Sequence, residues 1–515
     1  MRAARQAGAV ARRFAEQPGR VWALIFGLYL VGRVVLIVGG QVFTSYDAIT
    51  YAPRPGQPDD GLLSFTGQAP RPWGLPLFYA LFGSDGARTV AQWAVATVAW
   101  ACFAWELGRH LRSHAARYAT VALVLGLALL HPVASWDLAI LTESLSLSLG
   151  VLVLGLLLRW LRTGSVLSIG GMTAVAIWWT FLRPDIRVFT AVLMGVLVLV
   201  AGRALWRVRR TRPPAGAGAP RPAADNRTAR PAEGTAVTPR RTVAAAVASC
   251  LILGLGIVWY AAITPAMEQA MTRYDADAIV PPLPQDEHRI VYRLRVDVST
   301  NPELWHAYTT KIGMPTCPEL EAFTSDTLNW RGREWAEAYR RCPALVDWVQ
   351  ERRGQYFYAD LMRADFALFA KTFLRQLSLS LGGEAYADVP HVVPAAVEKL
   401  VFPSQRYGLP LALLGFAVTV GLAWWAGALR SHRGLVWFAA GVFTTALLSA
   451  TATIVLVTGE LQRFGVQETI ATRVAMLILL GCALDAWLSR RGLAEDQAGV
   501  SSTGAARPGP AQAAA

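Results

Sequence analysis

Apolar stretches near twenty residues long recur along the whole chain and constrain its fold more than any other feature. Such a stretch, folded as a helix, spans the ~30 Å hydrocarbon core of a bilayer, and lipid offers the backbone no other way to satisfy its hydrogen bonds. With 54% hydrophobic and 16% charged residues, the chain does not suit a soluble multidomain protein. We therefore predict an all-α polytopic membrane protein with about ten transmembrane helices. The predicted spans are residues 21–40, 90–108, 118–131, 144–161, 165–182, 186–206, 242–264, 408–429, 435–457 and 467–488.

The positions of the arginines orient these spans, because cytoplasmic connections of membrane proteins carry an excess of Lys and Arg. Arginines precede the first span and follow the second, fourth, sixth, eighth and tenth, so every second connection is basic. This alternation predicts a multi-pass protein of the bacterial inner (plasma) membrane with both termini in the cytoplasm. The same topology explains the formal net charge of +14, so we expect membrane lipids, and no nucleic acid, as partners of the basic segments.

Composition divides the chain into membrane-spanning and water-facing segments. Residues 207–241 are rich in Pro, Gly, Ala and Arg with almost no apolar content, which is typical of a flexible linker. The predicted segments are a cytoplasmic N-terminus at 1–20, spans one to six at 21–206 with an external loop at 41–89, a disordered cytoplasmic linker at 207–241, span seven at 242–264, an extracytoplasmic region at 265–407, spans eight to ten at 408–488, and a cytoplasmic tail at 489–515 that we expect to be disordered after Arg491.

The extracytoplasmic region 265–407 reads as folded, because aromatic residues accompany an excess of acidic over basic ones. Between 347 and 381, apolar residues recur at helical spacing among Arg and Asp. This pattern suits helices on a membrane surface and helices of a small domain equally well. Cys317 and Cys342 both lie in the region, where an oxidising exterior permits a disulfide, but spacing alone leaves their pairing open.

Chemistry-bearing side chains occur in four of the segments predicted to lie outside. They are Asp47 and Tyr51 after span one, Arg71 later in the same loop, Glu143 at the mouth of span four, and Arg183 with Asp185 between spans five and six. Each has an ordinary structural explanation, such as a helix cap for Asp47 and Glu143 or a lipid-phosphate anchor for Arg71 and Arg183. The gathering of acids and arginines on one face of the membrane favours a functional site instead.

The motifs around these residues resemble those of the GT-C superfamily of integral-membrane glycosyltransferases. The likeness is strongest to the branch of protein O-mannosyltransferase-like and aminoarabinose transferase-like enzymes, and it covers about residues 20–265. The matching elements are Asp-x-x-x-Tyr at 47–51, Arg-Pro-x-Gly-x-Pro-Leu-Phe-Tyr at 71–79, Thr-Glu at 142–143, Leu-Arg-Pro-Asp at 182–185 and, near the end, Leu-Gln-Arg-Phe at 461–464. The family's seven-span module, with long external loops after its first and seventh spans, also matches the predicted layout, in which the large external region lies between spans seven and eight.

The resemblance implies that a sugar passes from a polyprenyl-phosphate donor to an acceptor hydroxyl on a glycan, lipid or protein at the extracytoplasmic face of the membrane. Asp47 would be the general base that removes the acceptor proton. Arginines would stabilise the departing phosphate, and Glu143 would orient Arg183 or a sugar hydroxyl. The implied substrate-binding residues are Tyr51, Arg71, Glu143, Arg183, Asp185 and Arg463.

The sequence departs from the family pattern in two places. Many relatives carry two adjacent acids in the first loop, whereas Tyr46 precedes Asp47 here, so we predict no metal site and no obligatory cofactor beyond the donor. The family's Arg-Tyr element is usually followed by prolines, whereas Val466-Gln-Glu468 stands here. A polytopic transporter or lipid flippase, or a catalytically inactive scaffold, is the alternative. Transporters tend to show internal repeats and charges in the middle of their spans. We find no internal repeat in this sequence, and the candidate site residues lie at the external ends of the spans.

Overall fold

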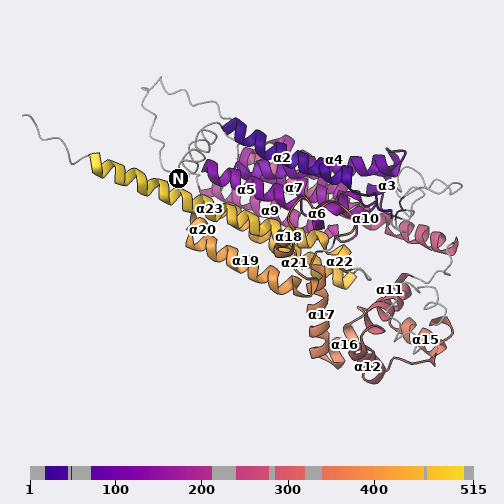
Figure 1. Ribbon diagram of the computed structural model, residues 1–515. Helices are drawn as coiled ribbons and strands as arrows, with labels where there is room; N and C mark the ends of the chain where they lie inside the picture. Colours follow the sequence, from indigo (N-terminus) through magenta and orange to yellow (C-terminus); the bar gives the residue numbers. More distant parts are fainter. Residues whose placement is uncertain are drawn as a thin grey trace, which may run out of the picture.

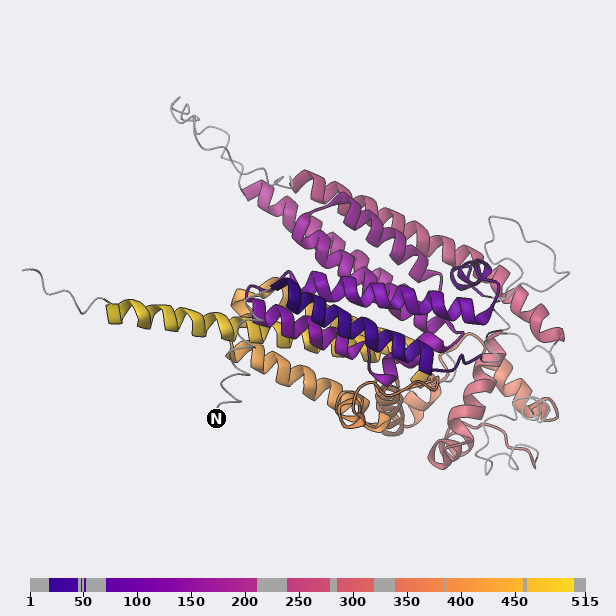
Figure 2. The ribbon, with the colours of Figure 1, turned by 45° about the horizontal axis from the view of Figure 1, so that its top comes forward.

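The computed structural model describes residues 18–44, 48, 51, 71–210, 239–277, 285–318, 339–383, 385–456 and 461–503. These residues are predominantly helical, which confirms the all-α prediction, and their single β-type pairing is an isolated bridge between Phe43 and Ala139. The long helices run side by side in an elongated bundle, and α11, α12, α15 and α16 gather at one end of it (Figures 1 and 2). The helices are α2 (Pro18–Gly39), α3 (Gly74–Ala80), α4 (Asp85–Gly108), α5 (His114–Leu127), α6 (His131–Ala134), α7 (Thr142–Thr163), α8 (Val166–Thr180), α9 (Ile186–Arg210), α10 (Pro239–Asp277), α11 (Gln285–Arg293), α12 (Pro302–Thr310), α15 (Pro343–Glu351), α16 (Ala359–Ala364), α17 (Phe366–Ser380), α18 (Ala395–Val401), α19 (Gly408–Trp425), α20 (Ala428–Ser431), α21 (Arg433–Leu456), α22 (Leu461–Phe464) and α23 (Val466–Thr503).

Within the described ranges, eight helices are long and apolar enough to cross a membrane, which indicates a multi-pass membrane protein. Each of the ten predicted stretches falls on a helix, but the third and fifth differ from simple spans. The third is bent by 60° between α5 and His131–Leu138, where Pro132 opens α6 after an extended residue. The fifth, α8, has 15 residues and is therefore about 22 Å long, less than the hydrocarbon core. The count of ten spans stays a prediction.

The helices continue past several boundaries that composition predicts. α9 and α10 extend into both ends of the segment 207–241, whose central residues lie outside the described part of the chain. α10 also passes residue 264 and ends at Asp277. α23 continues to Thr503, past the predicted boundary at Arg491, and the disorder expected in the tail stays a prediction. Adding residues to an existing helix costs much less free energy than nucleating a new one. Composition alone does not reveal this effect.

The buried guanidinium of Arg33 joins three parts of the bundle. Arg33 interrupts the apolar run of α2 and is only 1% exposed. Its Nη2 lies 2.6 Å from Oδ2 of Asp137, in the 3₁₀ segment after α6, and its Nε donates to Thr97 Oγ1 at 3.0 Å. Trp93 Nε1 donates to the carbonyl oxygen of Arg33 at 2.8 Å. These contacts tie α2 to α4 and to the bent third span.

Replacing Arg33 by Met should destabilise the protein, because it leaves the carboxylate of Asp137 buried without its counter-charge. Breaking such a buried pair from one side costs about 3–5 kcal/mol. The double variant Arg33→Met/Asp137→Leu removes both charges and should recover much of that loss. Thermal unfolding of the purified chain in detergent micelles measures both effects. If the single variant is no less stable than the double variant, the pair does not hold these helices together.

The helices α11, α12, α15 and α16 form a small domain with a hydrophobic core of its own. Val349 and Leu361 are fully buried in that core, whereas Phe366, at the start of α17, is exposed. The helical pattern predicted over 347–381 is thus interrupted, and its first part belongs to a small domain. A disulfide joins Cys317 to Cys342 with a Cα–Cα distance of 6.2 Å, which settles the pairing that the sequence left open.

Candidate functional site

Four of the residues predicted to bind substrate meet at one end of the bundle. They are Glu143, Arg183, Asp185 and Arg463, called the charge cluster below. Glu143 lies in the first turn of α7, Arg183 and Asp185 lie between α8 and α9, and Arg463 lies in α22. Glu143 is 0% and Arg183 2% exposed, and the other two residues are also buried. The structure therefore joins residues from three distant segments in one site.

The carboxylate of Glu143 is shared by two guanidiniums. Its Oε1 accepts a hydrogen bond from Nε of Arg463 at 2.7 Å, and Nη1 of Arg183 lies 3.3 Å from the same oxygen. Thr142 Oγ1 donates to Oε2 at 3.1 Å. The first turn of a helix also favours a negative charge, because the backbone dipoles point their positive ends there. Glu143 can therefore fix both guanidiniums at once.

Arg183 makes a second ion pair within its own turn. Its Nε donates to Oδ1 of Asp185 at 3.1 Å, and its Nη2 lies 2.9 Å from Oδ2, so the two side chains pair at two points. Nη2 also donates to the carbonyl oxygen of Phe464 at 3.2 Å, and the Phe464 ring centre lies 5.0 Å from the guanidinium carbon. The turn after α8 is therefore attached to α22 directly.

Helix α3 buttresses the same turn through a close backbone approach. The amide of Gly74 donates to the carbonyl oxygen of Phe181 at 3.1 Å, and a Cβ atom at position 74 would lie 2.7 Å from that oxygen. Trp178 Nε1 donates to the carbonyl oxygen of Gly74 at 2.9 Å. Only glycine fits here without movement of the backbone, which is how the Arg-Pro-x-Gly motif positions the loop before Arg183.

The electrostatics keep Arg183 charged. Burial opposes the charge, but the carboxylates of Asp185 and Glu143 outweigh burial and raise the pKa of Arg183 above its ordinary value. Two guanidiniums thus face two carboxylates in the charge cluster. An anion that enters must compete with these carboxylates for the arginine N–H groups.

Glu468, which the sequence analysis did not include in the site, lies beside the charge cluster at the start of α23. It interacts electrostatically with Arg183 and Asp185. Its Oε1 accepts a hydrogen bond from Ser449 Oγ at 2.5 Å, whereas its buried Oε2 has no hydrogen-bond partner among the described residues. A signal was present in the sequence, because an acid at the start of an apolar span is costly and is often functional.

Asp47, the predicted general base, lies outside the described residues, so the structure does not place it. Residues on its N-terminal side are held at the same end of the bundle as Glu143. The amide of Phe43 donates to the carbonyl oxygen of Leu138, and the amide of Ile140 donates to that of Phe43, each at 2.9 Å.

Tyr51, on the C-terminal side of Asp47, is buried near the charge cluster. Its ring centre lies 6.1 Å from that of Tyr79. The Tyr79 hydroxyl donates to Oε1 of Gln92 and lies 3.3 Å from the carbonyl oxygen of Leu141, two residues before Glu143. Burial, together with Tyr51 and Glu143, raises the pKa of Tyr79 well above its ordinary value, so this hydroxyl stays protonated. The guanidinium carbon of Arg71 lies over the Tyr51 ring, 5.6 Å from the ring centre.

In the part of the chain that the structure describes, no group of three or more His, Cys, Asp or Glu residues is arranged to hold a metal ion. Independence from metal stays a prediction, since the first loop, with Asp47, Asp59 and Asp60, lies outside that part.

No protein-family model matches the chain, and neither a curated protein nor a solved structure matches it. The GT-C resemblance therefore rests on the motifs quoted above.

Replacing Glu143 by Gln should destabilise the charge cluster, because both guanidiniums lose their shared counter-charge while they stay buried. We expect a loss of about 3 kcal/mol or more in the free energy of unfolding. Thr142→Val is the matched control on the neighbouring residue, since it removes one hydrogen bond to the same carboxylate and should cost about 1 kcal/mol. Thermal unfolding in detergent compares the two variants. Equal stability of Glu143→Gln and wild type would contradict the assigned role.

Proposed function

We propose that the chain is a glycosyltransferase of the inner membrane that moves a sugar from a polyprenyl-phosphate donor to an acceptor hydroxyl at the extracytoplasmic face, with Asp47 as general base. The observation that supports this proposal is the charge cluster. Its four members were selected by motif likeness at positions as distant as 143 and 463, and they form one buried network. A shared site explains why these motifs occur together in one chain.

The proposed reaction uses the groups of this site in a simple way. The acceptor oxygen forms a bond to the anomeric carbon of the sugar while its proton passes to the carboxylate of Asp47. The bond from that carbon to the phosphate oxygen breaks, and the electron pair stays on the phosphate. Arg183 and Arg463 then stabilise the added negative charge through paired N–H groups.

The carboxylates of the cluster would hold these arginines in place before the donor arrives. A guanidinium that is already positioned needs no reorganisation when negative charge develops on the phosphate. Nη1 of Arg183 has no hydrogen-bond partner among the described residues, although it lies 3.3 Å from Glu143 Oε1. It is therefore the N–H group that we propose a phosphate oxygen engages first.

Asp47→Asn tests the proposal, because an amide cannot accept the acceptor's proton. We expect the transfer rate to fall by roughly 10²–10⁴-fold, the usual contribution of a positioned general base. The readout is polyprenyl phosphate released from a labelled polyprenyl-phosphate sugar in membranes, which does not require the acceptor to be known. Asp59→Asn, in the same loop, is the matched control and should leave the rate unchanged.

Two outcomes would contradict this function. If Asp47→Asn releases polyprenyl phosphate as fast as wild type, Asp47 is not the base. If wild type releases none but moves the intact donor across the membrane, the chain is a flippase.

A further inference from the structure

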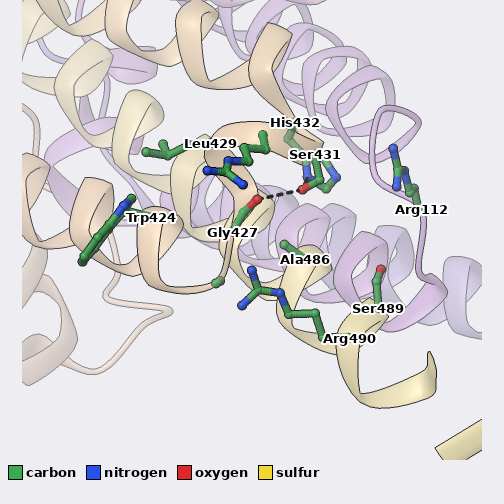
Figure 3. Close-up of a pocket in the computed structure, with 11 residues that line it drawn as sticks. Arg112, Trp424, Gly427, Leu429, Ser431, His432, Ala486, Ser489 and Arg490 are labelled. Carbon is green, nitrogen blue, oxygen red and sulfur yellow. Dashed lines mark hydrogen bonds between the residues drawn. The ribbon is translucent and has the colours of Figure 1, made fainter. Parts of the chain in front are cut away.

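A cavity of about 780 Å³ opens at the end of the bundle opposite to the charge cluster. It lies where α19, α20 and α23 meet the turn that follows α4 (Figure 3). Its walls include Arg112, Trp424, Leu429, Arg430, His432 and Arg490, and we call it the basic pocket. Three separate parts of the chain thus each bring a guanidinium to one hollow.

The turn between α19 and α20 is built around Arg490. Gly427 adopts a left-handed backbone with φ +72°, and a Cβ atom at this position would collide with the Arg490 guanidinium. Nη1 of Arg490 donates to the carbonyl oxygen of Trp425 at 3.2 Å. In Figure 3, Arg490 reaches from α23 towards Gly427, and Arg112 lies across the pocket from Trp424. Glycine at position 427 therefore lets the guanidinium lie against the turn.

The carboxylate of Asp485, which contacts His432 in the pocket wall, already has several partners. Asp485 is buried, lies 2.7 Å from Nε2 of His432, and accepts the backbone amides of Arg112 and Ser113 at 2.8 and 2.7 Å. Among the residues that the structure describes, no acidic one lines the pocket itself. The side chains of Arg112 and Arg430 make no hydrogen bond or ion pair to described residues, so their positive charge is not neutralised within this part of the chain.

The pocket also has an apolar side, next to the ends of three candidate membrane spans. The spans of α19 and α23 end beside the pocket, at Trp425 and Arg491, and the span of α21 begins there, at Arg433. Trp424 is 70% exposed, and exposed tryptophans are typical of the membrane interface. A ligand that fits both sides carries a phosphate and a hydrocarbon chain.

We propose that the basic pocket binds the headgroup phosphate of an anionic phospholipid, with the acyl chains lying along Trp424 and Leu429. Guanidinium forks match phosphate oxygens in geometry and charge, and basic pockets between transmembrane helices hold anionic headgroups elsewhere. This site is separate from the charge cluster and does not depend on the proposed transfer reaction.

Binding of phosphatidylglycerol to the purified full-length chain in detergent tests the proposal, with native mass spectrometry counting the bound lipid. Arg430→Gln/Arg490→Gln should weaken retention of the first lipid by about tenfold or more, because it removes two guanidiniums that would hydrogen-bond the phosphate directly. Arg433→Gln/Arg491→Gln is the matched control. It removes the same charge from neighbouring positions outside the pocket and should change retention by no more than about twofold, because solvent ions screen charges that do not touch the phosphate. Arg430→Lys/Arg490→Lys keeps both positive charges and should therefore retain part of the affinity for the lipid.

Several results would overturn the proposal. Equal losses in the two glutamine variants would show that diffuse charge, and not the pocket, attracts the lipid. Unchanged retention in the pocket variant would exclude these arginines. Equal retention of phosphatidylcholine would show that headgroup charge is irrelevant, and displacement of the lipid by inorganic phosphate would make the pocket a site for free anions.

Discussion

One carboxylate, that of Glu143, faces two guanidiniums that lie far apart in the sequence, Arg183 and Arg463. The cost of burying three charges is offset only while all three remain together. This constraint fixes the start of α7, the turn after α8 and helix α22 relative to one another. The first half of the bundle and its C-terminal spans are thereby joined at one end.

The two ends of the bundle treat positive charge differently. At the charge cluster, Arg183 and Arg463 are paired with carboxylates, so an anion must compete with Glu143 and Asp185. At the basic pocket, Asp485 is already bonded to His432 and to two backbone amides. Among the described residues, the pocket wall offers its guanidiniums no acidic partner. The first arrangement suits guanidiniums that must keep a fixed position during a reaction. The second suits retention of an anionic lipid.

Much of this organisation could be predicted from the sequence, because hydropathy and motif spacing are local signals. Apolar length placed the helices, and the motifs around Glu143, Arg183, Asp185 and Arg463 identified residues that the structure brings together. Arg71 lies over the ring of Tyr51, a contact that its motif does not reveal, because a motif reports neighbours in sequence and not the direction in which a side chain packs.

Other features depend on tertiary contacts that no local pattern reveals. The bend before Pro132 follows an otherwise apolar run, and the Cys317–Cys342 pairing requires the fold of the small domain. Glu468 was missed because its neighbours Arg183 and Asp185 are distant in the chain. Asp47 lies outside the described residues, so its part in the site stays a prediction.

The central claim is that Arg183 holds the phosphate of the lipid-linked donor, and the donor dependence of transfer measures this directly. Arg183→Gln should raise the KM for the polyprenyl-phosphate sugar by about tenfold or more, since a hydrogen bond to a charged group contributes about 1.5–3 kcal/mol. Arg187→Gln, in the first turn of α9, removes an equal charge from a side chain that donates to the carbonyl oxygen of Pro184, and it should leave the KM unchanged. A KM that is the same in wild type and Arg183→Gln, or that rises equally in both variants, would contradict the account.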